Sequence, residues 1–267
     1  MSDDDIALDE KRIYEERRAE TRAYVACELG VATVAVSDDQ IGRFGLEHQC
    51  TARDVAGADG QLAVATDEDV LVGDGDGEFV ATDFGPAAAV GLDGTVVAAS
   101  PEGTVARLDG DEWVPVGSVD DPRAIDGDLV AAGDGVFRIG ADSLDALTDS
   151  AARDVAAAGP YASTSAGILS GADDWAPAVA GDGTVVASDG DRAHAVVDGE
   201  LLARDDDGWD ESGAAAEGVV DVAYAGATIA VTADGVVAID PVTAKDGAPE
   251  WRSRSLGLSG VVGVAVP

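Results

Sequence analysis

The stretch RDVAGADGQLAVATDEDVLVGDGDGEFV, residues Arg53 to Val80, contains the pattern that decides the fold. It divides into four short segments of strand character, which we predict at 54–56, 61–66, 70–72 and 79–82. Glycine or aspartate interrupts the chain at every break, as in Ala58-Asp59-Gly60, and these residues are typical of tight hairpin turns. Within 61–66 the side chains alternate with the period of two of a β-strand. The stretch therefore predicts one small antiparallel sheet of four strands.

Such a sheet is apolar on both faces and cannot bury them alone, so it needs copies of itself on either side. The clearest mark of a copy is an acidic or glycine turn followed by a large apolar residue that opens the fourth strand. This mark recurs about every 31 to 42 residues, at Phe44, Phe79, Trp113, Leu144, Trp175, Trp209 and Trp251. A second mark, ARDVA, occurs at 52–56 and again at 152–156. We predict seven units, of which the second to seventh span 52–85, 86–121, 122–150, 151–178, 179–217 and 218–258.

The first unit has only three predicted strands, at 24–28, 31–36 and 41–49. The missing strand is at the other end of the chain, because SGVVGVAVP at 259–267 resembles the first strand of a repeat with nothing after it. If Val261 to Val266 pairs beside the strand that contains Tyr24, the ring closes and no exposed sheet edge is left at the junction. The sequence therefore predicts an all-β ring of seven four-stranded antiparallel blades at 23–267, closed by the C-terminal strand.

The net charge of −37, from 53 acidic and 16 basic residues, is spread over the turns of every unit. Self-repulsion on this scale opposes the compact state unless salt screens it, so we expect a halophilic protein in a salt-loaded cytoplasm. The rival interpretation, an acidic partner of basic proteins, predicts charge concentrated on one face. Direct nucleic-acid binding is disfavoured, because contact with phosphate requires a positive surface.

The opening residues Met1 to Asp5 lack the basic and apolar regions of a signal peptide, and no apolar run is long enough to span a membrane. Cys27 and Cys50 are the only cysteines and give no disulfide framework. We therefore expect a cytoplasmic monomer that does not contact a membrane. Residues 1–22 carry alternating charges, and they are either a solvated lead-in or a docking segment for an acidic surface.

Together these marks resemble the β-propeller proteins of haloarchaea over about residues 23–267. VVAIDPVTAKDGAPEW at 236–251 also looks like a blade of the pyrroloquinoline-quinone-type repeat, but the other six units do not follow that pattern. No Asp-box of the sialidase type and no Trp-Asp signature of the WD repeat is present. The resemblance implies the propeller fold, with ligands at one mouth of the central channel, and little specific chemistry.

Three arginines occupy matching positions, each two residues before an inner-strand aliphatic, and three aspartates lie one residue before such an aliphatic. They are Arg53, Arg123 and Arg153, and Asp54, Asp154 and Asp221. Equivalent positions in a ring point toward a shared axis, so the guanidinium groups could converge on an anion or on acidic side chains of a partner. Alternatively, each arginine pairs with carboxylates of its own or the adjacent blade.

A metal site or a catalytic site has less support in the sequence than an anion site at these arginines. His48, Cys27 and Cys50 match no zinc spacing, and His194 stands alone. The acidic turns at 74–78 and 205–207 do not have the spacing of a calcium loop, and no phosphate loop or nucleophile elbow is present. We therefore expect no metal and no cofactor.

Two functional hypotheses follow. The first is a non-catalytic scaffold that binds a protein or a small anionic ligand at the channel mouth. The second, from fold analogy alone, is a propeller enzyme of the lactonase, glycosidase or quinoprotein kind.

Overall fold

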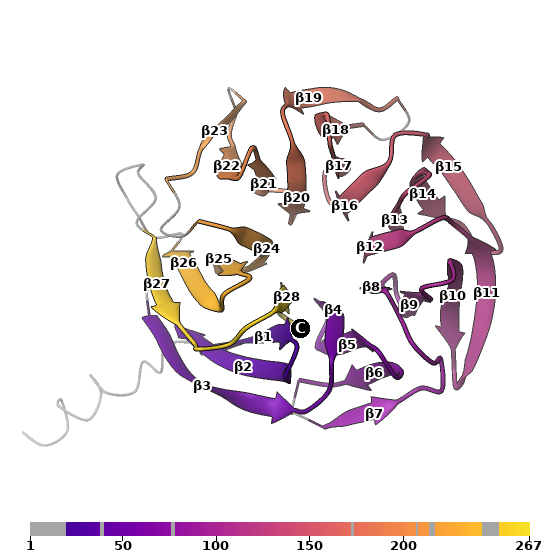
Figure 1. Ribbon diagram of the computed structural model, residues 1–267, viewed down its shortest axis with the longest axis horizontal. Coiled ribbons are helices and arrows are strands. Elements are labelled where there is room, and N and C mark those ends of the chain that lie inside the picture. The colour runs from indigo at the N-terminus through magenta and orange to yellow at the C-terminus, as the bar shows by residue number, and fades with distance from the viewer. Residues whose placement is uncertain are drawn as a thin grey trace, which may run out of the picture.

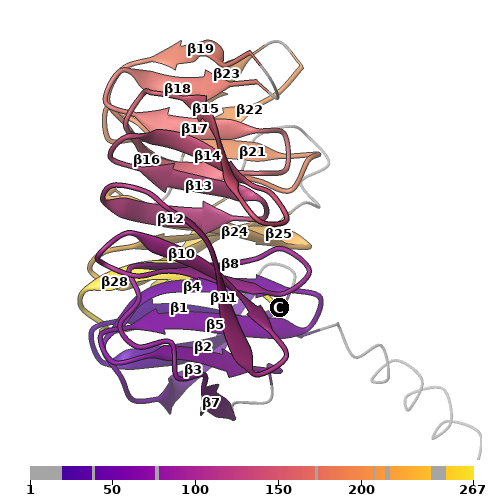
Figure 2. The same cartoon turned by 90° about the vertical axis from the view of Figure 1, so that its right-hand side faces the viewer.

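The computed structural model describes residues 20–37, 40–75, 78–171, 174–206, 208–213, 217–241 and 251–267. These residues form seven four-stranded antiparallel sheets arranged as the blades of a ring (Figure 1). The ring is viewed down its shortest axis in Figure 1 and from the side in Figure 2. The predicted fold class, a seven-bladed all-β propeller, is therefore confirmed.

Each blade adds its four strands from the central channel outward. Blade 1 contains β28 (Val261–Ala265), β1 (Thr21–Cys27), β2 (Gly30–Ser37) and β3 (Gln40–His48); blade 2 contains β4 (Ala52–Ala58), β5 (Gln61–Thr66), β6 (Val70–Gly73) and β7 (Phe79–Ala81). Blade 3 contains β8 (Ala89–Leu92), β9 (Val96–Ala99), β10 (Thr104–Asp109) and β11 (Glu112–Ser118); blade 4 contains β12 (Pro122–Asp126), β13 (Leu129–Ala132), β14 (Gly135–Ile139) and β15 (Leu144–Thr148). Blade 5 contains β16 (Ala152–Ala156), β17 (Tyr161–Thr164), β18 (Gly167–Ser170) and β19 (Ala176–Ala180); blade 6 contains β20 (Gly183–Ser188), β21 (Ala193–Val197), β22 (Glu200–Arg204) and β23 (Trp209–Glu211). Blade 7 contains β24 (Val219–Ala225), β25 (Ala227–Thr232), β26 (Val236–Pro241) and β27 (Arg252–Ser255).

Most strand ends differ from the prediction by one to three residues, and β4 extends by two residues at each end. β19 runs to Ala180, two residues past the predicted end of the fifth unit, because its last residue still pairs with Gly167. β1 begins at Thr21, so the propeller starts earlier than expected. The charged segment predicted at 1–22 lies mostly outside the described residues.

The core lies between neighbouring blades. On β5, Leu62 and Val64 face blade 1, whereas Ala63 and Ala65 face blade 3. The period of two thus sends one set of side chains to each interface, as a strand buried on both faces requires. Small residues suit this position because the blades pack closely.

The aromatic residues that mark the repeats join neighbouring blades at the outer side of the ring. Trp113 Nε1 donates to the Thr82 carbonyl at 3.1 Å, and Trp251 Nε1 donates to the Ser212 carbonyl at 3.0 Å. Trp209 packs edge-on against Tyr161 of the preceding blade. The repeated aromatic residue therefore stabilises the contact between one blade and the one before it.

The C-terminal strand closes the ring as predicted. β28 pairs with β1 in the register Tyr24 with Ala265 and Val25 with Val264, and so supplies the inner strand of blade 1. Val261 and Val264 are buried on either side of the exposed Val262. The first blade is thus built from both ends of the described chain.

Candidate ligand site in the central channel

The inner strands enclose a cavity of about 400 Å³ at the centre of the ring. Arg53 on β4, Arg123 on β12 and Arg153 on β16 all line it, each as the second residue of its strand. The structure therefore brings the three predicted arginines to the same end of one channel, which we call the arginine mouth. Whether they bind a ligand stays a prediction.

A repeated backbone irregularity sets this end of the channel apart. The register with the second strand of the blade shifts at Arg53, Arg123 and Arg153, so each arginine is the extra residue of a β-bulge. Thr184 and Val220 take the same position in blades 6 and 7. A bulge bends the strand and re-aims a side chain out of the regular alternation, which explains how consecutive residues such as Arg53 and Asp54 both line the channel.

Two of the arginines already have partners. Arg123 donates from Nη1 to the Ala152 carbonyl of blade 5 at 3.1 Å and from Nη2 to Asp121 Oδ2 at 2.6 Å. Arg153 donates from Nη1 to the Gly183 carbonyl of blade 6 at 2.9 Å and to Asp182 Oδ1 at 2.7 Å. Both arginines thus connect adjacent blades and have their charge balanced locally, as the alternative interpretation expected.

Arg53 differs from the other two. It is exposed at the arginine mouth and makes no hydrogen bond or ion pair with any residue that the structure describes. The sequence explains this, because the positions matching Asp121 and Asp182 are occupied by Thr51 and Pro86. Arg53 therefore presents an uncompensated positive charge beside the cavity.

The three predicted aspartates each join two inner strands. One carboxylate oxygen accepts the N–H of the next residue, and the other accepts an N–H from the inner strand of the following blade. The pairs are Asp54 with Val55 (2.8 Å) and Val90 (2.9 Å), Asp154 with Val155 (2.9 Å) and Val186 (2.9 Å), and Asp221 with Val222 (2.7 Å) and Val264 (2.7 Å). Because an inner strand is a sheet edge, these N–H groups have no ladder partner, and the carboxylates satisfy them. Their participation in ligand binding stays a prediction.

Asp126 has a related role that the sequence analysis missed. Its Oδ2 accepts the Ala157 N–H of blade 5 at 2.7 Å. Asp126 is the last residue of β12. The position directly after the bulge, which holds Asp54, Asp154 and Asp221 in their blades, is occupied by Ala124 in blade 4. Asp126 was missed in the sequence because it lies at a different position of the repeat from Asp54, Asp154 and Asp221. It nevertheless accepts a backbone N–H of the following blade, as they do.

Burial in the channel raises the pKa of these carboxyl groups, to about 7 for Asp54 and Asp221 and to about 8 for Asp154. Repulsion between neighbouring carboxylates adds to the rise, whereas the accepted N–H bonds oppose it. Burial likewise raises the pKa of Asp126. The channel is therefore less negative near neutral pH than its count of carboxyl groups suggests.

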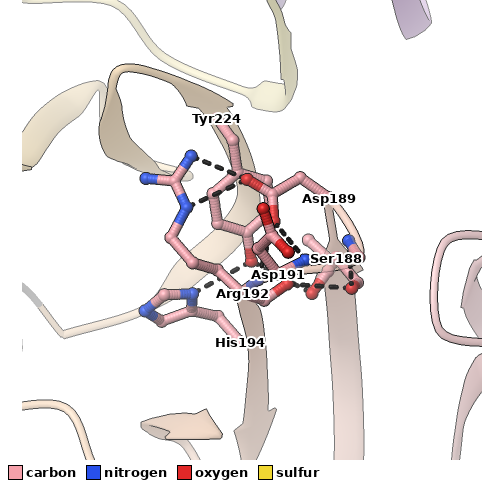
Figure 3. Close-up of polar contacts among 8 residues, drawn as sticks. Ser188, Asp189, Asp191, Arg192, His194 and Tyr224 are labelled. Carbon is pink, nitrogen blue, oxygen red and sulfur yellow. Dashed lines mark hydrogen bonds and ion pairs between the residues drawn. The ribbon is translucent and has the colours of Figure 1, made fainter. Parts of the chain in front are cut away.

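A second polar cluster lies at the other end of the channel, where Asp189 and Tyr224 line the cavity (Figure 3). The Tyr224 hydroxyl donates to the Ala187 carbonyl at 3.0 Å and lies 2.9 Å from His194 Nδ1. The Tyr224 hydroxyl has one proton, which it donates to the Ala187 carbonyl. Nδ1 of His194 therefore carries a proton and donates it to the hydroxyl oxygen of Tyr224. The Arg192 guanidinium lies over the Tyr224 ring and donates from Nε and Nη2 to Asp189 Oδ2 at 2.9 and 2.7 Å.

Most hydrogen bonds of this cluster stay within it, although Nη1 of Arg192 is buried and has no hydrogen-bond partner among the described residues. Burial, together with the nearby Arg192 charge, lowers the pKa of His194 to about 4. Burial also raises the pKa of Tyr224. His194, which looked isolated in the sequence, therefore forms a neutral pair with a tyrosine of the next blade, and the cluster joins blades 6 and 7.

The other residues considered for metal binding lie at the junctions of blades 7, 1 and 2, and Cys27 is close enough to Cys50 to contribute, after burial and Asp67, to the raised pKa of the Cys50 thiol. Cys27 is buried between blades 7 and 1, whereas Cys50 packs between blades 1 and 2, where His48 lies against Phe79. Within the described ranges, no three His, Cys, Asp or Glu residues are grouped so that they could hold a metal ion. The same ranges contain no helix with the length and hydrophobicity needed to cross a membrane.

The fold and the channel define a seven-bladed propeller with one arginine-bearing mouth. The family model of HVO_0234-like β-propellers matches residues 7–267, so the chain belongs to that β-propeller family. No curated protein matches the chain.

Several solved structures share the fold. A protein from Lactobacillus plantarum aligns with a TM-score of 0.63 at 13% identity, over 93% of this chain and 100% of that chain. The computationally designed protein Ika8 aligns with a TM-score of 0.58 at 16% identity, over 91% of this chain and 90% of that one. A putative 6-phosphogluconolactonase from Bacteroides fragilis aligns with a TM-score of 0.58 at 12% identity, over 93% of this chain and 98% of that one. At these identities the likeness shows the fold alone.

Proposed function

We propose that this chain is a non-catalytic binding propeller that takes an anionic group, of a small molecule or of a protein, at the arginine mouth. The observation that carries the proposal is the unpaired Arg53 beside the cavity. Arg53 is exposed and has no carboxylate partner among the described residues, in a chain with a net charge of −37. Its planar fork of N–H donors suits carboxylate and phosphate oxygens.

The other polar side chains of the channel favour binding over catalysis. The carboxylates of Asp54, Asp154 and Asp221 accept backbone N–H bonds, and Nδ1 of His194 and the hydroxyl of Tyr224 are engaged with each other. A general base needs a lone pair directed at a substrate, and these groups are engaged in joining blades. The net charge further supports a halophilic, cytoplasmic monomer, and the match to the family is consistent with a haloarchaeal source.

The test is a capture experiment in molar KCl with extract of the source organism. Immobilised wild type is compared with Arg53→Ala, with Arg153→Ala and with Arg43→Ala, whose arginine lies on the outer strand β3 with a side chain 80% exposed. We expect Arg53→Ala to lose the bound species, by about tenfold or more in affinity because a charge-assisted bond contributes roughly 1.5 to 3 kcal/mol. Arg43→Ala should retain it.

Arg153→Ala separates the structural role from binding. Because Arg153 connects blades 5 and 6, its loss should lower the melting temperature, whereas Arg53→Ala should leave the melting temperature unchanged. Equal capture by wild type and Arg53→Ala would refute the proposed function.

A further inference from the structure

The arginine mouth has two chemically different sides. β28 lies between β24 and β4 at the centre of the ring (Figure 1). Each of these strands presents its second residue at the mouth, so Val220, Val262 and Arg53 follow one another around the channel. Val262 is 40% exposed even though every other residue of β28 is buried. An apolar arc thus lies directly beside the unpaired guanidinium.

We propose that the arginine mouth binds a short aliphatic carboxylate, with the carboxylate on Arg53 and the hydrocarbon on Val262 and Val220. This inference rests on the proposed function and names the class of its ligand. Covering an exposed valine with an apolar group removes its surface from water and stabilises the complex. A ligand without a hydrocarbon part would leave Val262 and Val220 exposed to water.

The surroundings favour one negative charge over two. Asp54 follows Arg53 in the chain, and a Cβ built on Gly263 would lie 3.2 Å from Asp221 Oδ2 and 3.9 Å from Asp54 Oδ1, so both carboxyl groups lie just below the apolar arc. Asp54 and Asp221 are ionised only in part near neutral pH, and this partial charge would repel a dianionic phosphate at Arg53 more strongly than a carboxylate with a single charge. The cavity of about 400 Å³ has the size of a site for a small molecule.

The experiment is a calorimetric or NMR titration of the full chain in molar KCl with four compounds. 4-Methylpentanoate carries both groups, acetate carries the anion alone, 4-methylpentan-1-ol carries the hydrocarbon alone, and inorganic phosphate is the dianion. We expect 4-methylpentanoate to bind more tightly than the other three, with a gain over acetate of about fourfold for each CH₂ that becomes buried.

Variants test each side of the mouth. Arg53→Ala should weaken binding of 4-methylpentanoate about tenfold or more. Val262→Ser should remove most of the advantage over acetate and leave acetate binding unchanged. Arg43→Ala on the outer rim is the control. Because Arg53 has no partner among the described residues and Val262 is exposed, both variants should fold, which their melting temperatures check.

The outcomes distinguish the choice of an aliphatic carboxylate from the broader proposal that the mouth binds an anion. If acetate and phosphate bind in a way that depends on Arg53, but the hydrocarbon adds nothing, the aliphatic class is wrong and an anion-binding mouth remains. If the alcohol binds as tightly as the acid, or Arg53→Ala binds 4-methylpentanoate like wild type, the inference is overturned. The proposed function is refuted separately, by capture from extract that does not depend on Arg53.

Discussion

Removing the strand that closes the ring should destabilise the whole propeller. Val261 and Val264 on β28 are 3% and 4% exposed. Complete burial of a valine side chain stabilises a fold by about 1.5–3 kcal/mol, so the two together contribute roughly 3–6 kcal/mol. The ladder with β1 and the Val264 N–H bond to Asp221 add about 1 kcal/mol for each hydrogen bond. Deletion of 259–267 should therefore remove a large part of a typical total of about 5–15 kcal/mol.

Point variants on the same strand give a graded version of this test. Val264→Ala removes two buried methyl groups and should lower the free energy of unfolding by about 1.6 kcal/mol or more. Val262→Ala, on the exposed side of the strand, should change it by less than about 0.5 kcal/mol. For a chain of this size, about 1 kcal/mol shifts the melting temperature by about 2–4 °C.

The assay is denaturant and thermal unfolding in molar KCl, followed by circular dichroism. If β28 holds the ring together, Val264→Ala unfolds several degrees below wild type while Val262→Ala matches it. Equal effects of the two variants, or a truncated chain with the wild-type midpoint, would show that β28 does not hold the ring together.

Three further predictions concern salt, pH and a close backbone contact. If the net charge of −37 is adapted to a saline cytoplasm, the melting temperature should rise steeply into molar KCl, and a melting temperature indifferent to KCl would contradict this. Because burial raises the pKa of Asp154 to about 8, its contribution to stability is present at low pH and is lost as the pH rises through that value. Unfolding of wild type between about pH 6.5 and pH 8 should therefore show a larger loss of stability than unfolding of Asp154→Asn, in a window above the titration of His194, and parallel curves would refute the assignment. Gly167 has φ +126°, and a Cβ there would lie 1.8 Å from the Val179 carbonyl oxygen, so Gly167→Ala should cost roughly 2 kcal/mol or more in denaturant unfolding. Gly45→Ala, where a Cβ meets nothing within 4 Å, is the control and should be close to neutral; an equal cost of the two substitutions would be against the contact.

The architecture could be predicted from the sequence because it repeats. Strand alternation and the acidic turns recur along the chain, and the outer strand carries or directly follows an aromatic residue in every unit except the fourth, which has Leu144. Independent copies of a weak signal reinforce one another. The closure by β28 could also be predicted, because the first unit has only three predicted strands and the C-terminal segment resembles a first strand with no unit after it. Boundaries were less certain where no turn intervenes, as between Trp175 and Gly183.

The channel could be predicted only in part. The matching repeat positions predict that Arg53, Arg123 and Arg153 lie at one mouth. They do not predict which of the three is paired with a carboxylate, because a pairing carboxylate can come from another blade. Asp182 neutralises Arg153 from the following blade, and only the ring geometry shows that Pro86 takes that place for Arg53.

The carboxylate bridges and the second cluster were hidden for the same reason. In the sequence, an aspartate before a valine is equally typical of a turn and of a ligand site. Its bond to an N–H of the next inner strand becomes evident only when the blades are placed side by side. His194 and Tyr224 are 30 residues apart and share no motif. Contacts between blades join residues that no spacing rule connects in advance.

The most direct test of the central claim is photo-crosslinking from the arginine mouth itself. An aliphatic residue bearing a diazirine is placed at Val262, or at Val80 on the outer strand β7 as the control, and the protein is irradiated in molar KCl with extract of the source organism. The account predicts an adduct from position 262 that disappears when Arg53→Ala is combined with it, and none of the same mass from position 80. An adduct at position 262 that survives Arg53→Ala, or the same adduct from position 80, would contradict binding at this mouth through Arg53.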